Sequence, residues 1–334
     1  MATSNASPEL PTLRTFRPGG TTTIYAYYDG RTCPWQSSNW YDETLALGVA
    51  SYSIIDGNTA LLFDAGLTPA HGAHMLAHVR SLGADSVTTV YSHFHADHIA
   101  GASALRETKI VAHKGTYERL KKDAENLRNP GEGEGPSIDV VLPTETYEMT
   151  LSIQVGSITV ELHNFHIHTA DSTLLFIPES GLVFAGDMLE DTVTYLSDAE
   201  DLEKHIQELG RMAQLPIKKI LPAHGCPDRI RAGGFDKSLI DTTVRYLTAL
   251  SEPVEKPAAW EKTLEEVMKD DLAAGKLVYC QAYEGVHHEN IESIKEIREE
   301  NSAIDTTKSW DKQPDICNLS SYYTGQTIND RRES

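Results

Sequence analysis

The sequence predicts an α/β fold in which two β-sheets pack face to face between layers of helices, an αββα sandwich with a C-terminal helical extension. Apolar runs of strand length alternate with helical segments up to about residue 234, and the pattern then changes to helices. A chain of 334 residues can bury one large core together with such an addition. We therefore expect three parts: a flexible N-terminal arm at 1–20, the sandwich at 21–234, and at 235–334 helices packed on the core with a loose tail.

The sandwich is expected to open with strands at 21–28 and 49–55, the second joined through a turn at 56–58 to a strand at 59–63. A helix at 69–82 follows and carries three histidines at spacings of three and four residues: His71, His74 and His78. We expect a solvated helix face there. A metal site on this histidine ladder is the alternative, but no carboxylate accompanies it.

The remaining strands and helices follow in an order that fits two sheets. Strands are expected at 87–91, at a segment ending in His113, and at 150–155, 158–166, 172–177 and 182–185, with another ending near residue 221. Helices are expected after His113, at 200–213, and in the extension at 237–250, 258–272 and 290–299. The polar segment 129–137 reads as a loop.

A cluster of potential metal ligands follows the strand at 87–91. His93 and His95 point to the same side of an extended chain, while Asp97 and His98 lie where the chain bends and can face a second point nearby. Gly101 then permits a tight turn. The spacing predicts two adjacent metal ions, and surface histidines paired with acids are the alternative.

The string HFHADHIAG, which starts at His93, resembles the HxHxDH signature of the metallo-β-lactamase superfamily, and further motifs of that family follow in order over residues 22 to 230. The resemblance implies a second histidine at a later strand end, for which His168 is chosen over His163 and His166. His166 is kept as a reserve ligand or as a group that supports one; a packed or surface imidazole is the alternative. A Gly-Asp motif at Asp187 and a PAHG motif at His224 complete the resemblance.

The resemblance implies a complete set of ligands for two metals. His93, His95 and His168 would hold one metal, Asp97, His98 and His224 the other, and Asp187 would bridge them. Taken alone, Asp187 could equally be a turn or helix cap. Asp64 would support the metal loop without binding metal. Imidazole and carboxylate ligands suit Zn²⁺ best, with Mn²⁺ and Fe²⁺ as alternatives.

The implied activity is that of a dinuclear metal hydrolase that uses a metal-bound hydroxide to open a lactam or lactone, in detoxification or secondary metabolism. Asp97 would orient the attacking oxygen. A thioesterase of the glyoxalase II or polyketide-related kind is the runner-up, and an iron-dependent oxidoreductase is a third alternative. The flavodiiron branch of the superfamily is disfavoured because it carries a glutamate where His95 stands.

Two features favour a small cyclic substrate. An insertion at 29–46 contains Trp35 and Trp40, which would form an aromatic wall over the metals; packing of the extra loop is the alternative. Tyr195 follows Asp187 by eight residues and loosely resembles tyrosines that point at the substrate carbonyl in lactonase relatives, although ordinary burial would also explain it.

Composition restricts the partners and the compartment. The formal charge of −20 argues against nucleic acid, whose phosphates most of the surface would repel. No apolar run approaches the roughly 18 residues of a membrane span, the first residues lack a secretory signal, and the four cysteines form no CxxC pair. We expect a cytoplasmic enzyme with a small-molecule substrate and no membrane partner; the oligomeric state is left open.

Overall fold

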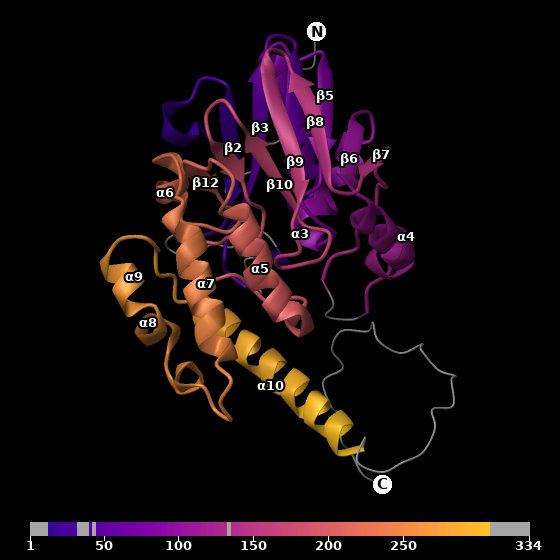
Figure 1. Cartoon of the computed structure of the whole chain (residues 1–334). Coiled ribbons are helices and arrows are strands. Elements are labelled where there is room, and N and C mark those ends of the chain that lie inside the picture. Colours follow the sequence, from indigo (N-terminus) through magenta and orange to yellow (C-terminus); the bar gives the residue numbers. More distant parts are fainter. Residues whose placement is uncertain (1–12, 32–39, 42–44, 132–134, 308–334) are drawn as a thin grey trace. The chain divides into compact units, whose positions relative to one another are not determined.

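The computed structural model describes residues 13–31, 40–41, 45–131 and 135–307. The chain divides into two units, Met1–Lys295 and Glu296–Ser334. The first unit holds both sheets and the candidate site (Figure 1). In the second unit, the described residues are the last part of one helix, α10 (Tyr283–Thr307).

The first sheet has seven strands in sequence order. Neighbouring strands from β1 to β4 run antiparallel, and those from β4 to β7 run parallel. The strands are β1 (Arg14–Phe16), β2 (Ile24–Asp29), β3 (Val49–Asp56), β4 (Thr59–Phe63), β5 (Ser86–Val90), β6 (Lys109–His113) and β7 (Glu145–Tyr147).

The second sheet has five strands in the order β12-β11-β10-β9-β8. All neighbours are antiparallel except β11 and β12. The strands are β8 (Thr150–Val155), β9 (Ile158–Asn164), β10 (Thr173–Ile177), β11 (Leu182–Phe184) and β12 (Lys219–Leu221). The expected strands at 150–155 and 59–63 have these same bounds, and the other expected strands differ from the observed ones by a few residues. β1 and β7 were not expected from the sequence.

The two sheets enclose an apolar core. Tyr52 of β3 stacks on Phe184 of β11 with ring centroids 4.7 Å apart, and Phe63 of β4 lies 5.7 Å from the same ring. Tyr52 also donates a hydrogen bond to the carbonyl oxygen of Pro222, at 2.5 Å. This hydrogen bond ties β3 to the chain just after β12, so the core packing also fixes the strand ends of the second sheet.

Helices cover the outer faces of the sheets. Met75 and Val79 of α2 (Pro69–Ser81) and Leu120 of α4 (Lys114–Arg128) pack in the apolar cluster on the outer face of the first sheet. On the other side, Arg211 of α5 (Leu202–Met212) lies over the ring of Phe165, directly after β9. The αββα sandwich is confirmed.

Short helices connect the main elements. They are η1 (Pro18–Gly20), α3 (Ala96–Ile99), η2 (Ala100–Leu105), η3 (Ala199–Asp201) and α6 (Pro227–Arg231). The helices after residue 235 begin with α7 (Ser238–Ser251), which packs beside α5 (Figure 1). No helix among the described residues has the length and apolar character needed to cross a membrane.

The structure corrects two expectations about helices and strands and leaves a third untested. Arg14–Phe16, expected within a flexible arm, pairs with β2 as the edge strand β1. The helix expected at 258–272 is broken into η4 (Ala258–Glu261), α8 (Leu264–Val267) and α9 (Lys269–Ala273), because Thr263 starts a new helix with a capping box. The division at residue 235 stays a prediction, since Phe235 still pairs with Ile220 of β12.

The histidines of α2 do not form a solvated face. His71 is buried and its Nε2 atom lies 3.2 Å from an oxygen of Asp29, and His78 Nδ1 lies 2.8 Å from the hydroxyl of Tyr27. Both partners belong to β2. These histidines therefore fasten α2 to the first sheet, and the metal-ladder alternative has no support among the described residues.

Replacing Phe184 with alanine should lower the free energy of unfolding by about 3–5 kcal/mol, because a buried aromatic side chain is lost and a cavity opens between the sheets. Urea denaturation followed by circular dichroism measures the change. Met149→Ala is the control, since this side chain is exposed and should cost less than about 0.5 kcal/mol. A comparable small loss for both variants would contradict the role assigned to the Phe184 ring.

Candidate metal centre

The candidate site lies at one edge of the sandwich, where strands of both sheets end. β5 leads to His93, β11 leads to Asp187 and β12 leads to His224. The residues that follow these three strands lie close together, since their ligand atoms gather in shared clusters. The carboxyl ends of strands are the usual place for ligand sites in α/β sheets.

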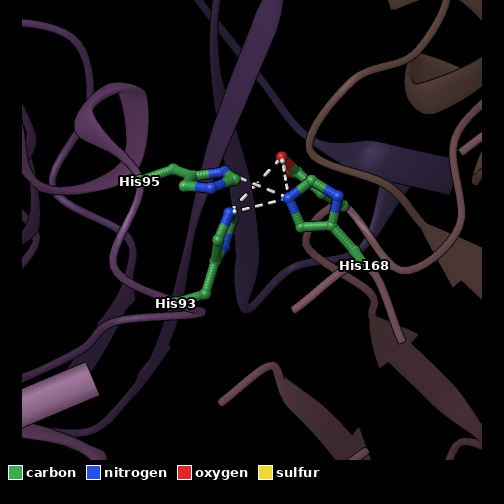
Figure 2. Close-up of side chains that lie close together, drawn as sticks. His93, His95 and His168 are labelled. Atoms are coloured by element: carbon green, nitrogen blue, oxygen red, sulfur yellow. Dashed lines mark hydrogen bonds and ion pairs between the residues drawn. The ribbon is translucent and has the colours of Figure 1, made fainter. Parts of the chain in front are cut away.

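The first ligand cluster consists of His93, His95, His168 and Asp187. One ligand atom from each lies within 4.8 Å of every other. His168 Nε2 lies 3.2 Å from His93 Nε2 and 3.1 Å from His95 Nδ1, and Figure 2 shows the three imidazoles pointing toward one another. Three ring nitrogens that face each other at this distance suit a shared cation.

His168 reaches this cluster from an irregular loop after β9. The strand ends at Asn164, and His168 has a positive φ of 69°, a conformation that L-residues rarely adopt. The other two histidines considered for this place lie elsewhere. His163 Nε2 pairs with Glu161 at 3.0 Å, and His166 Nε2 lies 3.3 Å from an oxygen of Asp201, so the reserve ligand is not in the site.

The second ligand cluster consists of Asp97, His98, Asp187 and His224, all buried. His98 Nε2 and His224 Nε2 each lie 3.2 Å from the same oxygen of Asp187. Asp187 thus belongs to both clusters. This is the bridging position expected for it from the sequence.

Hydrogen bonds from neighbouring groups orient the imidazoles. His98 Nδ1 lies 2.8 Å from Asp64, whose other oxygen accepts the backbone N–H of Ser92 at 2.6 Å. Asp64 therefore links His98 to the backbone of the metal loop, and its supporting role toward a bound metal stays a prediction. His224 Nδ1 donates to the carbonyl oxygen of Gly48 at 2.7 Å. With Nδ1 of His98 and His224 engaged in this way, Nε2 of each ring faces the cluster, as metal-binding histidines require.

Two tight glycine contacts shape the loops that carry ligands. A Cβ on Gly101 would lie 2.0 Å from the carbonyl oxygen of Ala65, so only glycine allows the metal loop to approach the chain after β4 this closely. Gly186 has a φ of 54°, and a Cβ there would lie 3.1 Å from the Cβ of Ser92. Gly101 thus packs the metal loop against a neighbouring segment of the first sheet, and Gly186 brings a ligand loop of the second sheet close to the metal loop.

Burial and neighbouring side chains shift the pKa values of the carboxylates and imidazoles in the site. Burial raises the pKa of Asp187, but the imidazoles of His224, His98 and His93 outweigh it and hold this pKa well below its usual range. Burial and the neighbouring His168 lower the pKa of His95 to about 3. The carboxylates of the cluster are therefore ionised and the His95 imidazole is neutral, which are the forms that bind metal.

The donor set fits divalent metal ions. Asp97 Oδ2 and Asp187 Oδ1 are buried and have no hydrogen-bond partner among the described residues, although Asp97 Oδ2 lies 3.1 Å from His98 Nε2. Buried carboxylate oxygens without hydrogen bonds are costly unless a cation compensates them. Nitrogen and carboxylate ligands without cysteine suit Zn²⁺ and related ions.

Sequence reasoning missed several groups around the second cluster. The buried ring of Tyr41 stacks on His224 with centroids 5.2 Å apart. Burial raises the pKa of Glu190, between Asp187 and Tyr195 in the chain, to about 8. Arg31 forms a buried bidentate ion pair with Asp191 at 2.6 and 3.1 Å. Glu190 and Asp191 follow Asp187 closely in the sequence. These two acids were the sequence signal that could have pointed to Glu190 and to the partner of Arg31.

The structure describes two of the three residues that were predicted to contact the substrate. The ring of Trp40 lies edge-on to Tyr41 and its Nε1 donates to the carbonyl oxygen of Leu67 at 2.9 Å. Trp35 lies outside the described residues. The ring of Tyr195 lies 6.2 Å from that of His168, while the Tyr195 carbonyl oxygen accepts the hydrogen bond of His168 Nδ1 at 2.9 Å. Their proposed contacts with substrate stay predictions.

A sandwich of two sheets with two ligand clusters that share one aspartate, at the edge where strands end, defines a class of metal-dependent enzymes. Residues 45–224, more than half of the chain, match the model of the metallo-beta-lactamase superfamily. The chain belongs to this superfamily, a family of metal-dependent hydrolases. The resemblance stated from the motifs is thereby confirmed.

Individual relatives are distant. The beta-lactamase-like protein 2 homolog of Drosophila melanogaster is 25% identical over 187 residues, which cover 53% of this chain and 59% of that protein. A metallo-beta-lactamase from Pontibacter korlensis has a TM-score of 0.55 at 17% identity and covers 71% of this chain and 99% of its own. The metallo-beta-lactamase FIM-1 from Pseudomonas aeruginosa, in a mono-zinc form, has a TM-score of 0.54 at 15% identity and covers 74% and 100%. These solved structures share the fold.

Replacing His95 with alanine should reduce the bound metal from about two ions to about one per chain, because all four ligands of the second cluster remain intact. Asp187→Asn should weaken both sites, since both clusters contain this carboxylate. Elemental analysis after dialysis measures the stoichiometry, and circular dichroism checks that each variant is folded. Unchanged metal content in both folded variants would contradict the ligand assignment.

Proposed function

We propose that the chain is a dinuclear metal hydrolase that opens a small cyclic amide or ester, a lactam or a lactone. The observation that carries the proposal is the shared carboxylate: one oxygen of Asp187 lies 3.2 Å from both His98 Nε2 and His224 Nε2, and the same side chain completes the cluster of His93, His95 and His168. Two cations held this close would act on one water and one carbonyl. Zn²⁺ is the proposed metal, with Mn²⁺ or Fe²⁺ as alternatives.

When two divalent cations are bound, they lower the pKa of a water molecule and polarise the carbonyl that it attacks. The chain would then supply orientation and proton transfer. Asp97, whose buried Oδ2 has no hydrogen-bond partner within the part of the chain that the structure describes, is proposed to take up a proton from the attacking water and to pass it to the leaving atom. Asp64, Gly48 and Tyr195 would fix the imidazoles through the hydrogen bonds described above, so the ligands need no rearrangement during the reaction.

Aromatic groups near the second cluster support a compact substrate. Tyr41 covers one face of His224, and Trp40 lies against Tyr41. Rings in this arrangement would offer an apolar wall to a ring-shaped substrate. Tyr195, beside His168, is proposed to face the substrate carbonyl from the opposite side. The names of the relatives, beta-lactamase-like and metallo-beta-lactamase, support a cyclic amide or ester as the first class to test.

The setting of the reaction is also a proposal. A net charge of −20 disfavours nucleic acid as a partner and leaves a small molecule as the expected substrate. We propose a cytoplasmic location from the composition, in which four widely spaced cysteines form no CxxC pair. No membrane partner is proposed.

Anaerobic incubation of the zinc- or manganese-loaded enzyme with lactones, lactams, aryl esters and thioesters should give ring opening, because hydrolysis needs no oxidant. Liquid chromatography with mass detection measures the product as substrate plus one water. Preferential cleavage of thioesters would move the protein to the thioesterase alternative. Bound iron together with turnover only in the presence of oxygen would contradict hydrolysis and favour the oxidoreductase alternative.

Replacing Trp40 with alanine, and separately Trp35, should change the ranking of substrates while both metals stay bound, because the proposed wall contacts the substrate and not the metals. The ratios of kcat/KM across the panel measure the change. Trp260→Phe is the control, since this indole donates to the carbonyl oxygen of Leu250 in the extension. An unchanged substrate profile in both tryptophan variants would contradict substrate contact and favour the alternative, in which these residues only pack the loop.

A further inference from the structure

The loop between Asp187 and η3 connects the metal centre to the helical extension. Residues 188–198 form no helix or strand, yet most of them are buried. Buried peptide groups outside regular structure must find partners elsewhere. One of these groups is the carbonyl of Tyr195, which accepts the hydrogen bond from His168 Nδ1 at 2.9 Å.

A single side chain of α10 fixes the peptide groups on either side of Tyr195. Asn290 is fully buried; its Oδ1 accepts the N–H of Leu196 at 2.8 Å and its Nδ2 donates to the carbonyl oxygen of Thr194 at 3.0 Å. These two hydrogen bonds use both ends of the amide. The orientation of the Tyr195 peptide therefore depends on a residue that lies 95 positions later in the chain.

The N–H of Tyr195 is held by a second pair of residues. Glu190 Oε1 accepts this N–H at 3.2 Å, and Glu190 Oε2 accepts the hydroxyl of Tyr283, at the start of α10, at 2.6 Å. The guanidinium of Arg31 lies over the ring of Tyr283 at 5.6 Å. The loop is thus fastened to α10 at Tyr283 and again at Asn290, about two helical turns apart.

We propose that Asn290 is a positioning residue for the first metal, acting on His168 through the carbonyl of Tyr195. The inference rests on the proposed function, because it assumes that His168 binds a metal. With Nδ1–H bonded to this carbonyl, His168 presents an unprotonated Nε2 to His93 and His95. His168 also has a positive φ, so its own backbone does not favour the position and an external restraint is needed.

The predicted consequence is selective for one of the two clusters. Asp187, His98 and His224 have no hydrogen bond to Asn290 in the described structure, and His224 is oriented by Gly48. Loss of the Asn290 amide should release the Tyr195 carbonyl and with it the ring of His168. Metal affinity at the first cluster should fall by about 10- to 100-fold, the usual effect of losing a group that orients a ligand, while the second cluster should change little.

The test is a titration of metal-free full-length protein with Co²⁺, followed by visible absorption, for wild type and Asn290→Ala. The variant should bind one equivalent of Co²⁺ about 10- to 100-fold more weakly and show an altered spectrum for that equivalent. Asn290→Leu serves as a second variant of nearly the same size. It can neither accept from Leu196 nor donate to Thr194, so it should show the same loss even if Asn290→Ala does not fold.

Ile294→Ala is the matched control, since Ile294 is buried one turn further along α10 and has no polar group to offer the loop. It should lower stability without changing Co²⁺ affinity. Wild-type affinity in both folded Asn290 variants, or an equal loss in Ile294→Ala, would overturn the role of Asn290 and leave the proposed function standing. Failure of the wild type itself to bind two equivalents of Co²⁺ would overturn both.

Discussion

The structure depends on one buried carboxylate among imidazoles. Asp187 lies within contact distance of both ligand clusters, and the histidines around it hold its pKa well below the usual range. An ionised carboxylate in a buried place is stable only where positive charge compensates it. Several local features bring positive charge close to the Asp187 carboxylate. They are the glycine contacts, the positive φ of His168 and the hydrogen bonds to the Nδ1 atoms of the histidines.

Much of the fold and the ligand set was readable from the sequence because the signals are local. Alternating apolar residues mark β8, a short apolar run marks β4, and the ligands of the metal loop stand within six residues of one another. A local sequence pattern was not enough to predict His168, Asp187 and His224 as ligands. They were found because the motifs of a known family follow in a fixed order, and the structure brings all three together with the metal loop.

The remaining site residues could not be predicted for a physical reason. Asn290, Glu190 and Tyr41 act through contacts between segments far apart in the sequence, and a buried asparagine on a helix has no periodic signature. The histidines of α2 were misjudged for the same reason. Their partners Asp29 and Tyr27 lie on a strand some forty residues earlier, so a helix face that looks solvated by its composition is in fact packed.

The distribution of ligands between the two sheets has a mechanical consequence. His93, His95, Asp97 and His98 follow a strand of the first sheet, whereas His168, Asp187 and His224 follow strands of the second. Metal ions held by this set would act as cross-links between two halves that otherwise meet through apolar side chains and a small set of hydrogen bonds such as that from Tyr52 to Pro222. The metal centre would thus reinforce the register of one sheet against the other, and loss of metal would loosen the sandwich first at the edge where substrate is expected to bind.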